Sequence, residues 1–108
     1  MAMNPDYAPT EPTRAEIDAL EGAALIEFGS PDCGHCRAAQ ALIGEAGAAH
    51  PRVRHLKIED GRGRALGRSF GVKLWPTLIF LSQGKEVERL VRPADASAIA
   101  LALARIDA

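Results

Sequence analysis

Hydrophobic and polar positions along this chain follow two patterns, which predict strands and helices in turn. Four stretches have the length and apolar content of strands, and the last two are close enough to form a hairpin. These predicted strands cover residues 23–28, 53–58, 76–81 and 86–91. Helical spacing of apolar residues, or capping residues, predicts helices at residues 13–20, 33–48, 64–69 and 95–106.

The order of these elements predicts the fold class. Strands that alternate with helices predict a parallel sheet with helices on its faces, and the late hairpin adds an antiparallel edge. Residues 13–108 are expected to form one domain, since the 108-residue chain is 47% hydrophobic and contains no internal linker. Residues 1–12 carry Pro5, Pro9 and Pro12, so we expect a loosely ordered segment without a regular strand.

Charge and hydropathy narrow the possible partners. The formal net charge is -1 and charges of both signs are mixed, so nothing favours binding to nucleic acid or to an acidic membrane. No stretch approaches the roughly 18 consecutive apolar residues of a membrane span. The first nine residues have neither the basic start nor the apolar run of a secretory signal. We therefore expect a cytoplasmic protein without membrane or nucleic-acid partners.

The two cysteines, Cys33 and Cys36, are the candidate reactive groups. A disulfide between them would close almost no loop, so stability does not account for the pair. Cys33 lies where a predicted strand gives way to a helix, and the free N–H groups and dipole of a helix N-terminus favour a thiolate. Cys33 would attack a substrate disulfide, and Cys36, one turn later, would displace the substrate and close the Cys33–Cys36 bond.

Two further interpretations of the cysteine pair stay open, namely metal or cluster binding and an inert pair. Zinc sites usually have four ligands, often as two spaced pairs, and His35, His50 and His55 form no second motif. Haem attachment requires a histidine after the second cysteine, where this chain has Arg37. We expect no metal and no cofactor, and we interpret His50 and His55 as surface or packing residues.

Taken with the later motifs, this arrangement resembles the thioredoxin family over about residues 13–106. The pattern is a strand, Cys33-Gly34-His35-Cys36 at a helix start, then Phe70-Gly71-Val72, Trp75-Pro76-Thr77, a hairpin and a terminal helix. The resemblance implies a thioredoxin fold, an α/β structure whose central mixed sheet of four to five strands is flanked by helices on both faces. It also implies a monomeric thiol–disulfide oxidoreductase that acts on protein disulfides, is recharged by a reductase and contributes to cell redox homeostasis.

The same resemblance implies roles for four residues beyond the cysteines. Pro76 matches the family's cis-proline, and Gly34, Trp75 and Pro76 would bind the extended substrate chain. Glu27 lies in an apolar run, six residues before the first cysteine, where family members carry a buried carboxylate; its implied role is proton exchange with Cys36. The alternatives are a trans Pro76, a Trp75 packed in the core and a solvated Glu27.

His35 gives the dipeptide of protein disulfide isomerases, Gly-His, rather than the Gly-Pro of common thioredoxins. A positive imidazole near Cys33 would favour the reduced thiolate and make the pair more oxidising. Common thioredoxins carry tryptophan immediately before the first cysteine and three residues earlier, where this chain has Asp32 and Gly29. Asp32 should oppose thiolate formation. Net reduction, oxidation and isomerisation all stay open, as does a thioredoxin-fold module that binds partners without turnover.

Overall fold

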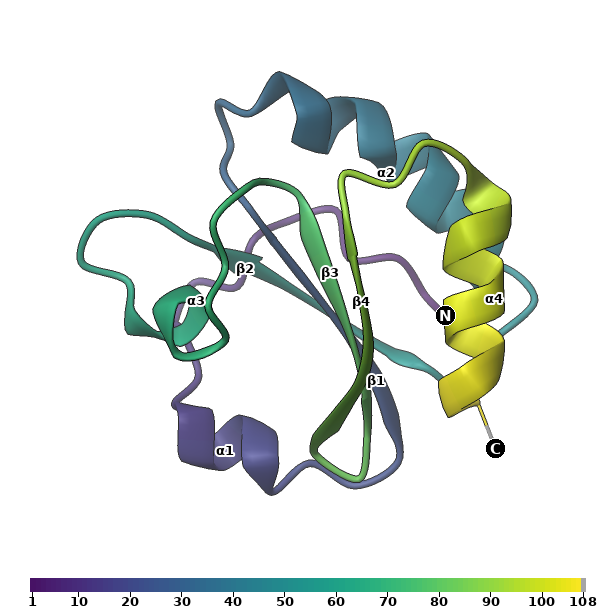
Figure 1. The fold of residues 1–108 in the computed structure, drawn as a ribbon, viewed down its shortest axis with the longest axis horizontal. Helices are drawn as coiled ribbons and strands as arrows, with labels where there is room; N and C mark the ends of the chain where they lie inside the picture. Colours follow the sequence, from purple (N-terminus) through teal and green to yellow (C-terminus); the bar gives the residue numbers. More distant parts are fainter. Residues whose placement is uncertain (108) are drawn as a thin grey trace.

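The structure is a computed structural model that describes residues 1–107, and its four strands form one mixed sheet in the order β2-β1-β3-β4 (Figure 1). The elements in chain order are α1 (Arg14–Asp18), β1 (Ala23–Gly29), α2 (Gly34–Gly47), β2 (Arg54–Glu59), α3 (Ala65–Ser69), β3 (Thr77–Ser82), β4 (Lys85–Val91) and α4 (Ala96–Ile106). All eight elements fall where the sequence predicts them, with ends that differ by a few residues.

The strand directions differ from the sequence prediction in one respect. β1 pairs in parallel with β2, but β3 is antiparallel to β1 and to β4, so the sheet contains a single parallel pair. The reason lies in the connection between β2 and β3. Its helix, α3, has five residues and rises only about 7.5 Å, so it is much shorter than the crossover helix that usually joins parallel strands. β3 therefore begins at the end of the sheet where β2 stops.

Alternating side chains of the central strands build two cores, one on each face of the sheet. Leu25, Leu78 and Phe80 pack against α2 and α4, while Ile26, Ile79 and Leu81 pack on the opposite face with residues of α1 and α3. Figure 1 shows α2 and α4 on one side of the sheet and α1 and α3 on the other. Both central strands are thus buried on both faces, and their continuous apolar runs follow from this.

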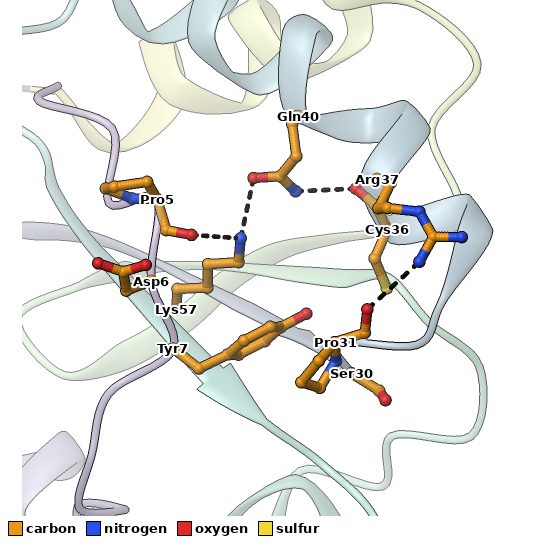
Figure 2. Close-up of a pocket in the computed structure, with 9 residues that line it drawn as sticks. All are labelled: Pro5, Asp6, Tyr7, Ser30, Pro31, Cys36, Arg37, Gln40 and Lys57. Atoms are coloured by element: carbon orange, nitrogen blue, oxygen red, sulfur yellow. Dashed lines mark hydrogen bonds between the residues drawn. The ribbon is translucent and has the colours of Figure 1, made fainter.

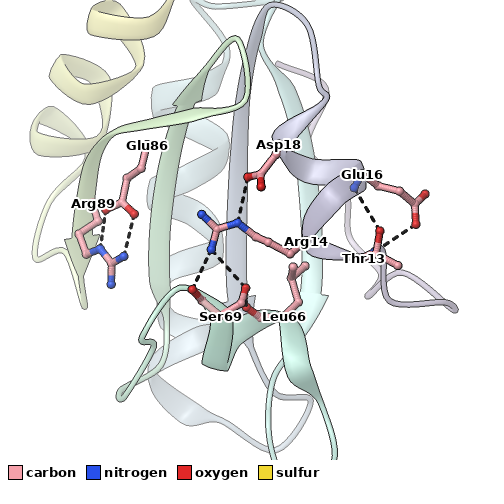
Figure 3. Close-up of polar contacts among 8 residues, drawn as sticks. All are labelled: Thr13, Arg14, Glu16, Asp18, Leu66, Ser69, Glu86 and Arg89. Atoms are coloured by element: carbon pink, nitrogen blue, oxygen red, sulfur yellow. Dashed lines mark hydrogen bonds and ion pairs between the residues drawn. The ribbon is translucent and has the colours of Figure 1, made fainter.

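Polar contacts fix α1 against α3 (Figure 3). Thr13 and Glu16 form the predicted capping box at the start of α1. The Arg14 guanidinium donates to the Ser69 carbonyl oxygen at 2.7 Å and lies 3.8 Å from the centre of the Phe70 ring. These contacts secure a helix of five residues, which would be too short to form alone.

Residues 1–12 contain neither helix nor strand, but they are packed along β2 rather than loose. The Asn4 N–H donates to His55 Nδ1 at 2.8 Å, and the Ala8 N–H donates to the Lys57 carbonyl oxygen at 2.8 Å. Lys57 Nζ donates in turn to the Pro5 carbonyl oxygen at 3.0 Å. The segment thus makes specific contacts with β2 although its prolines keep it out of the sheet. Among residues 1–107, no helix is long and apolar enough to cross a membrane.

Candidate active site

The junction between β1 and α2 places the two cysteines. Cys33 is the N-cap of α2, and its Sγ accepts a hydrogen bond from the Cys36 backbone N–H at 3.1 Å. Both residues are free thiols; Cys33 is half-buried and Cys36 is buried. A sulfur that accepts a backbone N–H at a helix N-terminus is well placed to carry negative charge.

The buried position of Cys36 gives its thiol different acid–base properties. Burial, followed by its hydrogen bond with Cys33, raises the pKa of Cys36 to about 11, whereas a backbone N–H from Ser30 lowers it. The negative charges of Cys33 and Glu27 add to the increase in this pKa. Cys36 is therefore a thiol at neutral pH and must lose its proton before it can act as a nucleophile.

A loop before β3 faces the first cysteine. The Trp75–Pro76 peptide bond is cis, and the Trp75 carbonyl oxygen lies 3.9 Å from Cys33 Sγ. Arg92 holds this loop through two hydrogen bonds. Its side-chain Nε donates to the Trp75 carbonyl oxygen at 2.8 Å, and its backbone N–H donates to the Pro76 carbonyl oxygen at 3.0 Å. The Trp75 indole Nε1–H donates to the Asp60 carboxylate at 2.8 Å. Trp75 is half-exposed beside the cysteines and is not a residue of either core.

Glu27 is fully buried, which excludes the solvated alternative. Its side chain lies on the α2 side of the sheet, where both carboxylate oxygens accept hydrogen bonds. Oε2 accepts from Gln40 Nε2 at 2.8 Å and Oε1 accepts from His55 Nε2 at 2.9 Å. Gln40 Nε2 also donates to the Cys36 carbonyl oxygen at 2.8 Å. One amide group thus links the buried carboxylate to the turn that carries Cys36.

The proton on His55 can be assigned from its partners. Nδ1 accepts the Asn4 N–H, so Nε2 carries the proton and donates it to Glu27. Lys57 Nζ donates to Gln40 Oε1 at 3.1 Å, which fixes the amide with its nitrogen toward Glu27. Each side chain of this buried network therefore has a defined donor or acceptor role.

The other predicted site residues are exposed at the start of α2. His35 and Gly34 follow Cys33 in the first turn, and Asp32 precedes it. His35 lines a cavity of about 190 Å³ together with Pro76 and Arg92, on the side of the cis peptide. The structure therefore brings His35 and Pro76 to one cavity, while Glu27 lies in the interior behind the cysteines.

A second cavity, of about 270 Å³, opens on the opposite side of the cysteine turn (Figure 2). It is lined by Cys36, Gln40 and Lys57 from the sheet and α2, and by the N-terminal segment, including Tyr7. The Lys57 ammonium lies 4.8 Å from the centre of the Tyr7 ring. The buried cysteine is thus reached from a side that does not include the cis peptide.

Sequence reasoning missed His55, Gln40, Lys57 and Tyr7. The sequence contains a signal for His55 and Lys57, because they are alternate residues of a strand and therefore lie on the same face. In the sheet they pair in register with Leu25 and Glu27. Polar residues on the core face of a strand require partners. His55, interpreted from the sequence as a surface or packing residue, is buried and hydrogen-bonded to Glu27. His50 lies elsewhere, and its Nδ1 is 2.7 Å from Asp107 Oδ2. Within residues 1–107, no three His, Cys, Asp or Glu side chains group as a metal site.

Two adjacent thiols, one half-exposed at a helix N-terminus and one buried behind it, define a protein able to form a reversible intramolecular disulfide. The thioredoxin family model matches residues 9–105. The chain belongs to the thioredoxin family.

Individual relatives agree with this assignment. The structure of reduced thioredoxin 2 from Pseudomonas aeruginosa superposes with a TM-score of 0.85 and 52% identity, and the match covers 96% of each chain. Thioredoxin from Chlamydia muridarum is 36% identical over 70 residues, which are 65% of this chain and 69% of that protein. Human protein disulfide-isomerase A2 is 39% identical over 84 residues, covering 72% of this chain and 16% of that protein. The chain spans about half to two thirds of the curated thioredoxins it matches.

Proposed function

We propose that this protein is a thiol–disulfide oxidoreductase that reduces or exchanges protein disulfides through a reversible Cys33–Cys36 disulfide. The observation that carries the proposal is the asymmetry of the pair. Cys33 is partly exposed and its Sγ accepts a backbone N–H at 3.1 Å, whereas Cys36 is 2% exposed. A partly exposed nucleophile beside a buried partner is the arrangement that a two-step exchange requires.

The exchange proceeds in two balanced steps. The Cys33 thiolate attacks one sulfur of a substrate disulfide, and the other substrate sulfur leaves with the bonding electron pair and takes up a proton. Cys36 then loses its proton and attacks Cys33; the Cys33–substrate bond breaks and the second substrate sulfur leaves as a thiol. The substrate is reduced by two electrons and the cysteine pair is oxidised by two.

Glu27 is proposed to exchange the proton of Cys36. It is the buried carboxylate whose charge contributes to the raised pKa of Cys36, after burial and the hydrogen bond with Cys33. Gln40 connects the carboxylate to the backbone of the cysteine turn. A group able to accept this proton would supply the Cys36 thiolate at neutral pH.

The substrate chain is proposed to lie across Gly34, Trp75 and Pro76. The half-exposed Trp75, fixed through Asp60, provides an apolar surface beside the nucleophile. His35 lines a cavity with Pro76 and is proposed to favour the reduced form. Partners would be disulfide-bearing proteins and a recycling reductase; a monomeric, cytoplasmic protein that contributes to redox homeostasis stays our prediction.

The test is reduction of insulin by dithiothreitol, with the wild type, Cys33→Ser and Cys36→Ser compared. We expect turnover by the wild type, none by either variant, and a substrate trapped on Cys33 in Cys36→Ser only. Mild oxidant should remove both wild-type thiols without covalent dimers. Folded protein whose thiols do not cycle would indicate a binding module instead. Stoichiometric metal, with thiols that react only after chelation, would indicate the metal interpretation.

A further inference from the structure

The absence of a side chain at Gly29 leaves a space behind the cysteines that two other residues share. A Cβ atom at this position would lie 2.7 Å from Cys36 Sγ and 2.9 Å from the Tyr7 hydroxyl oxygen. Both distances are too short for a real Cβ contact, so the sulfur and the hydroxyl converge on this point. In Figure 2 the Tyr7 ring extends from the N-terminal segment with its hydroxyl directed toward Cys36.

The N-terminal segment holds Tyr7 in this position. The next residue, Ala8, donates its N–H to the Lys57 carbonyl, and the Lys57 ammonium lies over the Tyr7 ring. Burial, followed by the negative charges of Cys36, Glu27 and Cys33, raises the pKa of Tyr7, and a hydrogen bond with Cys36 contributes to the increase. Tyr7 is therefore a phenol throughout the physiological pH range, and its O–H is available as a donor.

From this geometry we propose that Tyr7 is a catalytic residue of the resolving step, whose hydroxyl donates a hydrogen bond to the Cys36 sulfur and stabilises its thiolate. The inference rests on the proposed exchange reaction. In the mixed disulfide Cys33 is bonded to substrate and is no longer a charged neighbour of Cys36, but Cys36 is still buried. A donor at the sulfur then offsets part of the cost of charging a buried thiol.

The step itself transfers no proton from Tyr7. Cys36 loses its proton, its thiolate attacks Cys33, and the Cys33–substrate bond breaks with its electron pair on the leaving sulfur. The other groups around the Cys36 sulfur are the Ser30 N–H and the charges of Cys33 and Glu27. Asp6, Arg37 and Lys57 are the charged residues that line the same cavity.

The test uses Tyr7→Phe, which keeps the ring beside Lys57 and removes only the hydroxyl. Rapid mixing with 5,5′-dithiobis(2-nitrobenzoate) resolves the two steps, because attack by Cys33 releases one thionitrobenzoate and resolution by Cys36 releases the second. We expect the first phase to be unchanged. If the hydroxyl lowers the pKa of Cys36 by about one unit, its loss makes the second phase about threefold slower at pH 7, since nucleophilicity partly offsets the tenfold loss of thiolate.

The pH profile separates this role from a structural one. The half-rise is the pH at which the rate constant of the second phase reaches half of its maximum. In Tyr7→Phe it should move up by about one pH unit. The maximum rate constant at higher pH should be about threefold higher than in the wild type. A second phase that is slowed equally at every pH, or is unchanged, would overturn the proposal. Failure of the wild type to release a second equivalent would instead refute the proposed exchange function.

Two further variants test whether the effect belongs to the contact between the Tyr7 hydroxyl and the Cys36 sulfur. Asp6→Asn changes a neighbouring residue of the same cavity and should leave the half-rise in place; an equal shift there would overturn the proposal. Gly29→Ala places a methyl group where the hydroxyl and the sulfur meet, and should shift the half-rise in the same direction as Tyr7→Phe. In the Tyr7→Phe background its effect should shrink, and full additivity would contradict a shared contact.

Discussion

The hydrogen bond between Trp75 and Asp60 ties the loop before β3 to the end of β2, and its removal should weaken both the fold and the candidate site. Asp60 Oδ2 accepts the indole N–H at 2.8 Å, and its other oxygen lies where a Cβ on Gly67 would be. A hydrogen bond to a charged group contributes about 1.5–3 kcal/mol, and both partners here are half-exposed. We therefore expect Asp60→Ala to lower the free energy of unfolding by about 1–2 kcal/mol.

This loss converts into a measurable change in melting temperature. With an unfolding entropy of about 2.1 cal/mol/K per residue, 108 residues give about 0.23 kcal/mol/K. The expected decrease in Tm is then about 4–9 °C for the reduced protein. Asp60→Asn keeps an acceptor oxygen and nearly the same shape, so it should retain most of the stability. Unfolding by heat, followed by circular dichroism, makes the comparison.

Asp60→Ala should also change the surroundings of Trp75, the single tryptophan of the chain. Its fluorescence should report the loosened loop in Asp60→Ala. Insulin reduction should decline more than reaction with a small aromatic disulfide, because only a protein substrate is long enough to occupy the proposed binding surface beside Trp75. An Asp60→Ala protein with wild-type Tm and wild-type emission would refute this account. Equal losses with both substrates would show that the loop does not act through substrate binding.

Three further outcomes are expected. His35→Pro should make the pair more reducing, by part of the roughly 90 mV between protein disulfide isomerase and thioredoxin pairs, as measured by equilibration with glutathione. Glu27→Gln should slow thionitrobenzoate release by Cys36 between pH 6 and 8, and an unchanged rate would remove Glu27 from the reaction. Gly84→Ala should lower the free energy of unfolding in urea by more than about 1 kcal/mol. The new Cβ would collide with the Asp18 carbonyl, and the backbone φ of +76° at this position is unfavourable for alanine.

The sequence was sufficient for the elements that local pattern determines. Strand β1 is one apolar run, α1 begins with a capping box, and Cys33 follows directly from the turn that ends β1. In each case the signal lies within a few residues, where spacing and capping chemistry act. The direction of β3 could not be obtained in this way, because it depends on how far a short helix carries the chain.

The candidate site likewise contains a part that local sequence predicts and a part that depends on distant contacts. The cysteine pair is visible as a motif, but the partners of Glu27 come from distant parts of the chain. His55 is 28 residues away from Glu27, and the Asn4 N–H that fixes its tautomer is 51 residues from His55. Tyr7 could not be assigned to Cys36, since nothing local in a proline-bearing segment indicates which strand it will lie against. Such contacts depend on strand register and on the path of a loop, which no local pattern specifies.

The path of residues 1–12 also protects the sheet from unwanted pairing. β2 is an edge strand of the four-stranded sheet, and an uncovered edge offers free N–H and C=O groups to any other extended chain. Here the Ala8 N–H occupies the Lys57 carbonyl, and the segment covers the edge without adding a strand. Pro5 and Pro9 have no N–H to donate, so the covering segment is itself a poor edge for pairing. The prolines that prevent a fifth strand thereby close one end of the sheet to further growth.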